Sequence, residues 1–305
     1  MITVFGSLNV DLILPVERLP VAGETVIGGG YSMAAGGKGA NQALAARRAG
    51  AEVRMVGAVG RDGFAEIALA ELETDGVDVS RVARVDVTTG AAFIAVDGRG
   101  QNQILVAAGA NLEARAAQLE DTALRAGDTL LLQMEVPAAE NGRLLARAKS
   151  RGLRTVLNLA PALAVDRTTL ARLDWLVVNE IEVATAAAIV GGPADAPEAA
   201  ARHLALNGIA TVVTCGAKGA LAIGPDEAWR IDALAIDPID STGAGDAFTG
   251  AFAASLDRGD GVAEALRRAS VAGGLACLGH GAQPSLPWRS AIEARLATLP
   301  AARRV

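Results

Sequence analysis

Short runs of β-branched and aliphatic residues alternate with Ala- and Leu-rich amphipathic segments along most of the chain. The runs predict strands, and the segments between them predict helices, at the following residues: strands 2–6, 53–59, 129–133, 155–158, 175–178 and 211–214, and helices 40–49, 64–74, 138–150 and 197–206. Strands joined through helices are typical of βαβ units, whose strands run parallel beneath covering helices. The pattern therefore predicts an α/β fold with a central, mostly parallel sheet flanked by helices.

Two stretches interrupt this alternation, residues 12–35 and 88–107, which are β-like without helices between them. In the second, Asp97-Gly98 is a hairpin signal between the apolar runs 93–96 and 103–106. We expect one domain spanning residues 1–305, with a small β-sheet inserted from these two stretches. This sheet is either a lid over the ends of the parallel strands or an edge extension of the main sheet.

Composition excludes several classes of function. A net charge of −6 gives no overall attraction to nucleic acid or to an anionic membrane, so we expect neither as a partner. No apolar run reaches the ~18 residues that a membrane-spanning helix needs. Cys215 and Cys277 are far apart in the sequence, and the first residues lack a signal-peptide pattern. We therefore expect a cytoplasmic protein without structural disulfides.

The segment Asp240-Ser-Thr-Gly-Ala-Gly-Asp246 precedes an apolar run that predicts a buried helix. Small residues at Gly243, Ala244 and Gly245 leave main-chain N–H groups open to an anion at the start of this helix. A carboxylate in the first turn, Asp246, could act as the general base of a phosphoryl transfer beside that anion. Alternatively, it is only a carboxylate that the helix dipole stabilises.

The glycine-rich turn Gly36-Gly37-Lys38-Gly39-Ala40-Asn41 opens a second helix. It is not a Walker loop, because Gly39 stands where Ser or Thr would follow the lysine. The turn could bring backbone, a cation and an amide to a polyol, or it could merely be a tight turn. Asn9 and Asp11 present the same choice, since we expect them at the end of the first buried strand, where they could bind sugar hydroxyls or form a turn.

Polar groups also follow four later strands, in the segments 133–135, 158–161, 179–182 and 214–219. The carboxyl ends of parallel strands meet at one edge of a sheet, so we expect these groups to gather there. No strand is followed by G-x-G-x-x-G, which argues against a nicotinamide-dependent dehydrogenase.

Taken together, these segments resemble the ribokinase branch of the PfkB-type carbohydrate kinase family over the whole chain. The segment Asp240 to Asp246 is similar to the C-terminal signature of that family, and Gly36 to Ala43 to its N-terminal signature. The stretch His280 to Trp288 also resembles this branch. The resemblance implies transfer of the γ-phosphoryl group of ATP to the 5-hydroxyl of D-ribose, or alternatively to another pentose or a nucleoside.

The resemblance also implies a role for individual residues. Asp246 would deprotonate the attacking hydroxyl, and Gly243, Ala244 and Gly245 would form the anion hole. Ribose would be held by six residues: Asn9, Asp11, Gly37, Lys38, Asn41 and Glu135. ATP would lie along Asn179, Thr214 and Gly216.

Two cations and a dimer are implied in the same way. Glu182 would orient water around the Mg²⁺ that accompanies ATP. A monovalent cation, K⁺, would lie beside the anion hole, at positions that match these residues: Asp240, Thr242, Cys277, His280, Ala282 and Ser285. Members of the family commonly pair through the small sheet, so we expect a homodimer.

Two further alternatives concern the ligand and the reaction. Polar side chains favour a free sugar over a nucleoside, because a base needs an apolar slot and aromatic residues make up only 3% of the chain. A non-catalytic sugar or nucleotide sensor with the same fold would need neither Asp246 nor an anion hole. The presence of both therefore favours a kinase.

Overall fold

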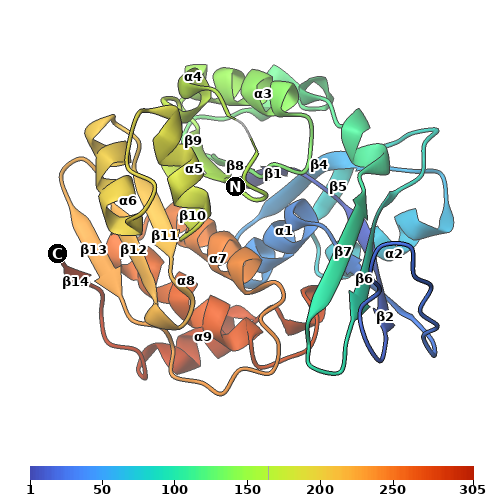
Figure 1. Ribbon diagram of the computed structural model, residues 1–305. Helices are drawn as coiled ribbons and strands as arrows, with labels where there is room; N and C mark the ends of the chain where they lie inside the picture. The colour runs from blue at the N-terminus through green and yellow to red at the C-terminus, as the bar shows by residue number, and fades with distance from the viewer. Residues whose placement is uncertain (164) are drawn as a thin grey trace.

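The computed structural model describes residues 1–163 and 165–305, and a ten-stranded sheet forms its centre (Figure 1). The strands of this sheet follow the order β14-β13-β12-β11-β10-β9-β8-β1-β4-β5. Their bounds are β1 Ile2–Phe5, β4 Val53–Val59, β5 Asp78–Arg84, β8 Thr129–Leu132, β9 Arg154–Asn158, β10 Trp175–Asn179, β11 Thr211–Thr214, β12 Ala220–Ile223, β13 Ala228–Ile231 and β14 Arg303–Arg304. From β11 to β5 all neighbours pair in parallel, whereas β12, β13 and β14 extend the sheet antiparallel. The predicted mostly parallel sheet is confirmed.

Helices cover both faces of this sheet. Their bounds are α1 Lys38–Arg48, α2 Gly63–Thr74, α3 Ala138–Ser150, α4 Arg167–Leu170, α5 Glu182–Ile189, α6 Pro197–Leu206, α7 Ala244–Arg258, α8 Val262–Ala276 and α9 Arg289–Leu296. Along β9 the side chains alternate, so Val156 joins the core beneath α1, α7 and α8, and Leu157 joins the core beneath α3, α5 and α6. No helix in the described ranges has the length and apolarity needed to cross a bilayer.

The predicted strands and helices agree with the structure to within two residues at each end. Because β8 to β11 are parallel, their carboxyl ends Leu132, Asn158, Asn179 and Thr214 lie along one edge of the sheet. The prediction that polar groups gather at this edge is confirmed.

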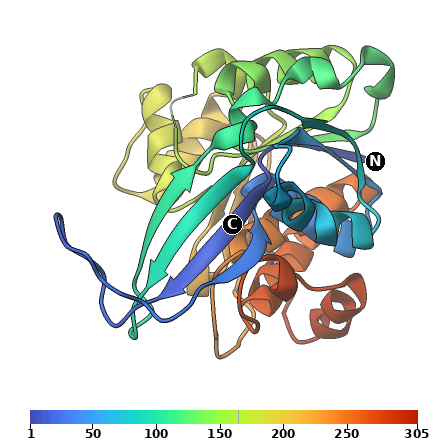
Figure 2. The same ribbon diagram turned by 90° about the vertical axis from the view of Figure 1, so that its right-hand side faces the viewer.

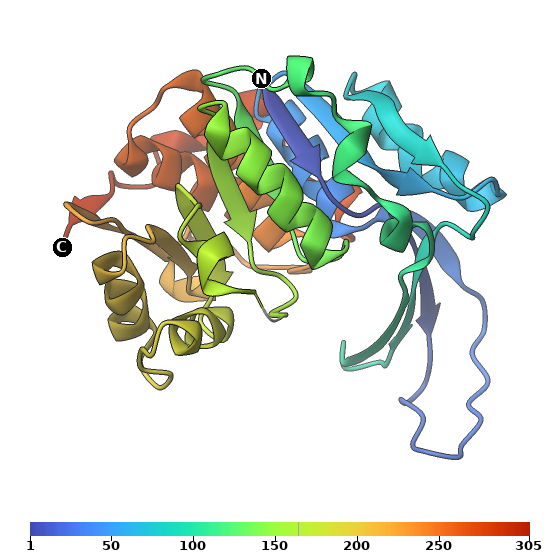
Figure 3. The same cartoon turned by 90° about the horizontal axis from the view of Figure 1, so that it is seen from above.

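A second, four-stranded sheet projects from the main body (Figures 2 and 3). Its strands follow the order β3-β2-β6-β7, with bounds β2 Asn9–Pro15, β3 Ser32–Gly36, β6 Gly90–Val96 and β7 Asn102–Ala107. The predicted stretch 12–35 is only partly strand, because residues 16–31 form an irregular loop. The expectation that Asn9 and Asp11 end the first strand was wrong, since that strand stops at Phe5 and both residues lie in β2.

The hairpin between β6 and β7 is present, but its loop is longer than Asp97-Gly98 suggested. Asp97 N–H donates to the carbonyl of Gln101 at 2.9 Å, so five residues connect the strands. The positive φ falls on Gly100, at 76°, and not on Gly98. The Asp97 side chain accepts from the N–H groups of Arg99 and Gln101, which supports the larger loop.

Helices α1 and α7 cross in close contact at Gly250. A Cβ on Gly250 would lie 2.6 Å from Ala45 Cβ, 2.7 Å from the carbonyl oxygen of Gln42 and 2.8 Å from the nitrogen of Ala46. No such contact is tolerated without movement of one helix, so the glycine sets the distance between the two backbones.

We predict opposite effects for two Gly→Ala substitutions. Gly250→Ala should lower the free energy of unfolding by about 1–3 kcal/mol, because overpacking separates α1 from α7. The matched control is Gly142→Ala in α3, where the nearest atom to the new Cβ would be Thr169 Oγ1 at 3.8 Å. That change should raise stability by about 0.5–1 kcal/mol through helix propensity. Urea unfolding measures both; a Gly250→Ala protein as stable as the original would contradict the close packing.

Candidate functional site

A cavity of about 240 Å³ opens at the carboxyl ends of β9, β10 and β11, where α1 and α7 begin. Its walls come from five separate parts of the chain. The lining residues are Lys38, Asn158, Ala160, Val177, Val178, Asn179, Glu182, Thr214, Ser241, Gly243, Gly245, Asp246 and Thr249. Seven of the residues expected from the sequence therefore meet here: Lys38, Asn179, Glu182, Thr214, Gly243, Gly245 and Asp246.

Asp246 lies in the first turn of α7 and is 7% exposed. Two amides of α1 hold its carboxylate: Asn41 Nδ2 donates to Oδ2 at 3.0 Å, and Gln42 Nε2 donates to Oδ1 at 2.8 Å. Burial raises the pKa of Asp246, while Lys38 and the two amide donors act to lower it. The result is a buried carboxylate in one fixed orientation, with a basicity above that of an exposed aspartate.

The start of α7 supplies main-chain donors beside this carboxylate. Gly243 has a φ of 76°, and a Cβ there would lie 2.9 Å from the Cα of Ala282, so only glycine fits. The expectation that the N–H of Ala244 is open to an anion was wrong, because this N–H donates to the carbonyl of Ser241 at 3.2 Å. Within the described residues, the N–H groups of Gly243, Gly245 and Asp246 have no protein acceptor. Three donors at the positive end of a helix dipole form an anion site.

Lys38 is the cation at the centre of the site. Burial by itself would lower the pKa of its ammonium, but the negative charges of Asp246, Glu135, Glu182 and Asp11 raise it, and the net direction is upward. The lysine therefore stays protonated and partly offsets a cluster of carboxylates.

Burial and the same cluster of carboxylates raise the pKa of Asp11, but for an acid this favours the neutral form. Burial, followed by the charges of Glu135 and Asp246, raises the pKa of Asp11 to about 6, against a smaller lowering by Lys38. Its carboxylate faces Gly36, where a Cβ would lie 2.4 Å from Asp11 Oδ2. Burial likewise raises the pKa of Glu182.

Glu135 fixes the start of α1. Its Oε2 accepts from Ser7 Oγ at 2.5 Å and from the N–H of Lys38 at 3.0 Å. Gly37, at φ 90°, and Gly39 let this turn lie against the chain between β1 and β2, since a Cβ on Gly39 would be 2.4 Å from the nitrogen of Ser7. The glycines therefore let the two chain segments approach closely. The first N–H groups of α1 already donate to acceptors within the protein.

Asn9 is held from the η1 segment, the 3₁₀ helix Gly109–Glu113. Asn111 Nδ2 donates to Asn9 Oδ1 at 2.6 Å, and Asn111 Oδ1 accepts from the N–H of Leu8 at 2.9 Å. This pairing leaves the Asn9 amide nitrogen as the donor end. The sequence analysis missed Asn111, which no local motif marks.

After β10, the side chains of Asn179 and Glu182 bond to main-chain N–H groups of the same short segment. Asn179 Oδ1 accepts from the N–H groups of Ile181 and Glu182, and Glu182 Oε2 accepts from the N–H of Asn179 at 2.8 Å. Nearby, Thr214 Oγ1 donates to the carbonyl of Val178. Gly216 lies further out, in the 3₁₀ helix Gly216–Lys218, and does not line the cavity.

The residues expected to surround a monovalent cation come from two loops that lie against each other. Asp240 Oδ2 accepts from the N–H of Gly281 at 2.9 Å, and the carbonyl of Cys277 accepts from the N–H groups of Ile239 and Asp240. Ser285 Oγ donates to the carbonyl of Ala282 at 2.8 Å. These contacts bring together all of the expected stretches, which contain Asp240, Thr242, Cys277, His280, Ala282 and Ser285.

Buried Arg48 holds the second of these loops to the end of α1. Its Nη1 donates to the carbonyls of Gln283 at 2.6 Å and Leu286 at 3.2 Å, and its Nε pairs with Asp75 at 2.6 Å. The guanidinium also lies 5.3 Å from the ring centre of Trp288. The C-terminal loop beside Gly243 is thus anchored by α1.

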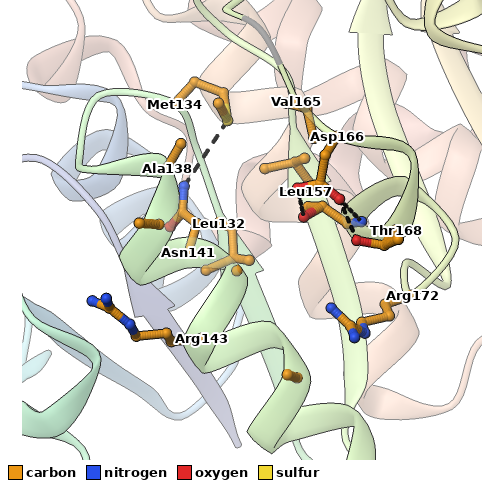
Figure 4. A pocket seen from close by; sticks show the side chains of 14 residues that line it. Leu132, Met134, Ala138, Asn141, Arg143, Leu157, Val165, Asp166, Thr168 and Arg172 are labelled. Atoms are coloured by element: carbon orange, nitrogen blue, oxygen red, sulfur yellow. Dashed lines mark hydrogen bonds between the residues drawn. The ribbon is translucent and has the colours of Figure 1, made fainter.

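A second cavity, of about 440 Å³, lies between α3 and α4 on the opposite face of the sheet (Figure 4). It shares no lining residue with the cavity around Asp246. Its carboxylate, Asp166, already accepts hydrogen bonds from the hydroxyl of Thr168 and from the hydroxyl and N–H of Thr169, which lower the pKa of Asp166 to about 2. The convergent acids and the open helix start lie in the smaller cavity, and we place the candidate site there.

Comparisons with known proteins agree with this geometry. Ribokinase of Haemophilus influenzae is 33% identical over 292 residues, covering 94% of this chain and 95% of that protein. Deoxyribokinase of Salmonella typhi is 34% identical over 294 residues, with 94% and 95% coverage. The solved structure of Arabidopsis thaliana ribokinase complexed with ribose and ATP superimposes with a TM-score of 0.87 at 30% identity, covering 97% of this chain and 98% of that one.

Membership of a family follows from the extent of the match as well as from the site. The model of the pfkB family carbohydrate kinases matches residues 1–289, which include both glycine-rich helix starts and all of the expected site residues. This chain belongs to the pfkB family of carbohydrate kinases.

Proposed function

We propose that this protein transfers the γ-phosphoryl group of ATP to the 5-hydroxyl of D-ribose. The observation that carries the proposal is the buried Asp246 carboxylate, which two amide donors fix in the same first turn of α7 as three open N–H groups. A base beside an anion site is what in-line phosphoryl transfer to a hydroxyl requires. The ribose- and ATP-bound relative supports the choice of both substrates.

In the proposed reaction, Asp246 accepts the proton of the sugar hydroxyl as its oxygen attacks the γ-phosphorus. The N–H groups of Gly243 and Gly245 stabilise the charge of the transferring group, together with Lys38. Asn9, Asp11, Gly37, Lys38, Asn41 and Glu135 hold the remaining hydroxyls. Ala244 supports the anion hole by bonding to Ser241 and not by donating to phosphate.

ATP lies along Asn179, Thr214 and Gly216 in this proposal, and Glu182 acts on the water around Mg²⁺. In the described chain no group of three or more His, Cys, Asp or Glu side chains is suited to bind a metal. This fits a Mg²⁺ that is held mainly by ATP phosphates, with one carboxylate nearby. Mg²⁺ supplies charge neutralisation of the phosphates when bound.

The monovalent cation is proposed to be K⁺, held by oxygens of the loops that contain Asp240 and Ser285. Oxygen donors suit such a hard cation, and Cys277 Sγ instead donates to the carbonyl of Gly273. Partial burial acts to raise the pKa of Asp240, but hydrogen bonds from Thr242 and Gly281 together outweigh it and lower the pKa, so this carboxylate is charged at neutral pH. Cys215 and Cys277 are free thiols, in keeping with a cytoplasmic location.

The four-stranded sheet is proposed to act as a lid over ribose and to exclude water from the site. Asp11 lies on β2 with its carboxylate beside Gly36 of β3, and its pKa responds to the charges of Glu135 and Asp246, so this sheet brings a carboxylate to the proposed site. A lid that closed on ribose would complete the site only with sugar present, and this would limit ATP hydrolysis.

We predict that Asp246→Asn lowers kcat by at least two orders of magnitude, roughly the scale of general base catalysis, because the amide cannot accept the proton. Ribose binding should change little, since the shape of the side chain is kept. A coupled ADP-release assay and calorimetry measure the two effects. The matched control is Asp232→Asn, whose carboxylate pairs with Arg303 on the surface. Near-normal turnover of Asp246→Asn would reject the assignment of the base.

Substrate identity is tested by a panel of sugars with and without K⁺. Relatives named ribokinase and deoxyribokinase are about equally similar to this chain, so 2-deoxyribose is the strongest competitor, followed by other pentoses and nucleosides. We expect the highest kcat/KM with D-ribose and a several-fold loss when K⁺ is replaced by choline. A higher kcat/KM with 2-deoxyribose or adenosine would contradict ribose as the substrate, but it would not contradict phosphoryl transfer from ATP.

We also propose that two copies of the chain form a homodimer through the lid sheet. Met33, Leu12, Phe93 and Leu105 lie in register across the four strands, and Leu105 is 74% exposed. Strand alternation places this row on the face opposite Asp11. An exposed apolar row of this kind marks an interaction surface.

We predict that light scattering gives twice the chain mass of 30.9 kDa, and that Leu105→Glu gives a single chain mass because a charge cannot be buried in the interface. Leu206→Glu is the matched control, since Leu206 is 86% exposed on α6, outside the lid sheet. A monomeric wild-type protein would contradict the proposal.

A further inference from the structure

Three buried amide side chains connect the catalytic carboxylate to the centre of the sheet. Gln133 Nε2 donates to Gln42 Oε1 at 2.8 Å, and Gln42 Nε2 donates both to Asp246 Oδ1 at 2.8 Å and to Asn158 Oδ1 at 2.9 Å. Gln42 and Gln133 are 0% exposed, and Asn158 is 8% exposed. The α1 position that binds Asp246 is therefore part of a chain of hydrogen bonds and not an isolated contact.

The direction of every bond in this chain is set by one main-chain group. Asn158 Nδ2 donates to the carbonyl of Val177 at 3.1 Å, and a carbonyl can only accept. The Asn158 oxygen must then face Gln42, so Gln42 must present its amide nitrogen to it. The Gln42 oxygen is left to accept from Gln133, and its nitrogen, with two hydrogens, also reaches Asp246.

A reversed Gln42 amide would oppose oxygen to oxygen at Asn158 and at Asp246. Each of these is a buried polar group without a partner, which is costly inside a protein. The nitrogen of Gln42 is therefore fixed toward Asp246 before any substrate binds. Asn41 donates to the other oxygen, Oδ2, so the plane of the carboxylate is held from both sides.

We propose that Gln42 is the positioning residue of the catalytic base: its fixed amide donor orients the Asp246 carboxylate toward the sugar hydroxyl and keeps it ionised. The inference rests on the proposed phosphoryl transfer, in which Asp246 is the base. Gln42 acts through Asp246 and needs no contact with the substrate.

The charges that face Asp246 give the sign of the expected effect. Lys38 on α1 favours the ionised carboxylate, whereas Glu135 after β8, Asp11 on β2 and Glu182 on α5 oppose it. Burial raises the pKa of Asp246, and the Gln42 donor acts against this rise. Removal of the donor must raise the pKa further, so the base loses its proton only at a higher pH.

The test is the pH dependence of kcat/KM for ribose in the full-length protein, whose acid limb reports the base in the free enzyme. In Gln42→Met, of similar shape but without the donor, we expect the limb to move up by about one pH unit. In Gln42→Glu a second carboxylate faces Asp246, and we expect a larger upward shift. Two variants are used because either one could fail to fold.

Thr155→Val is the matched control. Thr155 is 0% exposed and lies near the other end of β9, where its hydroxyl bonds to Asp174 Oδ2 at 2.9 Å. This variant also loses a buried hydrogen bond, but we expect its acid limb to stay at the wild-type pH even where its Tm falls.

The possible outcomes separate the two proposals. If the wild-type protein shows no ribose-dependent ATP turnover, the proposed function fails. If the wild type is active and the folded Gln42 variants keep its acid limb, the positioning role is overturned. A shift of equal size in Thr155→Val would also overturn it, because general loosening would then explain the change.

Discussion

The contact between α1 and α7 is the constraint on which the rest of the site depends. Asp246 begins one helix, and its two amide partners, Asn41 and Gln42, begin the other. The hydrogen bonds allow little variation in the distance between the helices, and Gly250 permits that distance by having no side chain. A carboxylate this deeply buried is tolerated because it is bonded on both oxygens and lies near Lys38.

The electrostatics of the site follow from that same burial. Asp246, Glu135, Glu182 and Asp11 surround a single lysine, an excess of negative charge that is unfavourable for a nucleotide with several negative charges of its own. The positive groups are therefore concentrated where phosphate would lie: Lys38, and the open N–H groups at the start of α7. Mg²⁺ and a monovalent cation would supply the remaining positive charge, which is a physical reason for expecting both beside this acidic cluster.

Sequence reasoning predicted the layout of the site well because parallel strands obey a simple rule. Asn179 and Thr214 could be placed together from their positions at strand ends alone. The role of Gln42 could not be predicted in this way, since its partners Asn158 and Gln133 are 116 and 91 residues away and meet it only after folding. The only local signal was two adjacent amides, Asn41 and Gln42, in an otherwise alanine-rich buried helix.

The errors at the second sheet and at the start of α7 have a similar cause. Asn9 was expected at the end of the first strand, but the chain leaves the main sheet at Phe5 and enters another, and nothing in the apolar pattern marks the change. Ala244 was expected to donate to an anion, but its N–H donates instead to the carbonyl of Ser241, only three residues earlier in the chain. Such local choices depend on φ and ψ values that residue type alone does not determine.

The second sheet is joined directly to the helix that holds Asp246. Strand β3 ends at Gly36 and α1 begins at Lys38, so Gly37 alone separates the lid sheet from the helix that holds Asp246. Asn9 and Asp11 lie on β2, paired directly with Gly36 and Ala34. A movement of the lid sheet must therefore be absorbed at Gly37, whose φ of 90° is available to glycine, or be passed on to α1. Because Lys38, Asn41 and Gln42 all belong to α1, the proposed closure of the lid sheet over a sugar would be felt by the helix that holds Asp246.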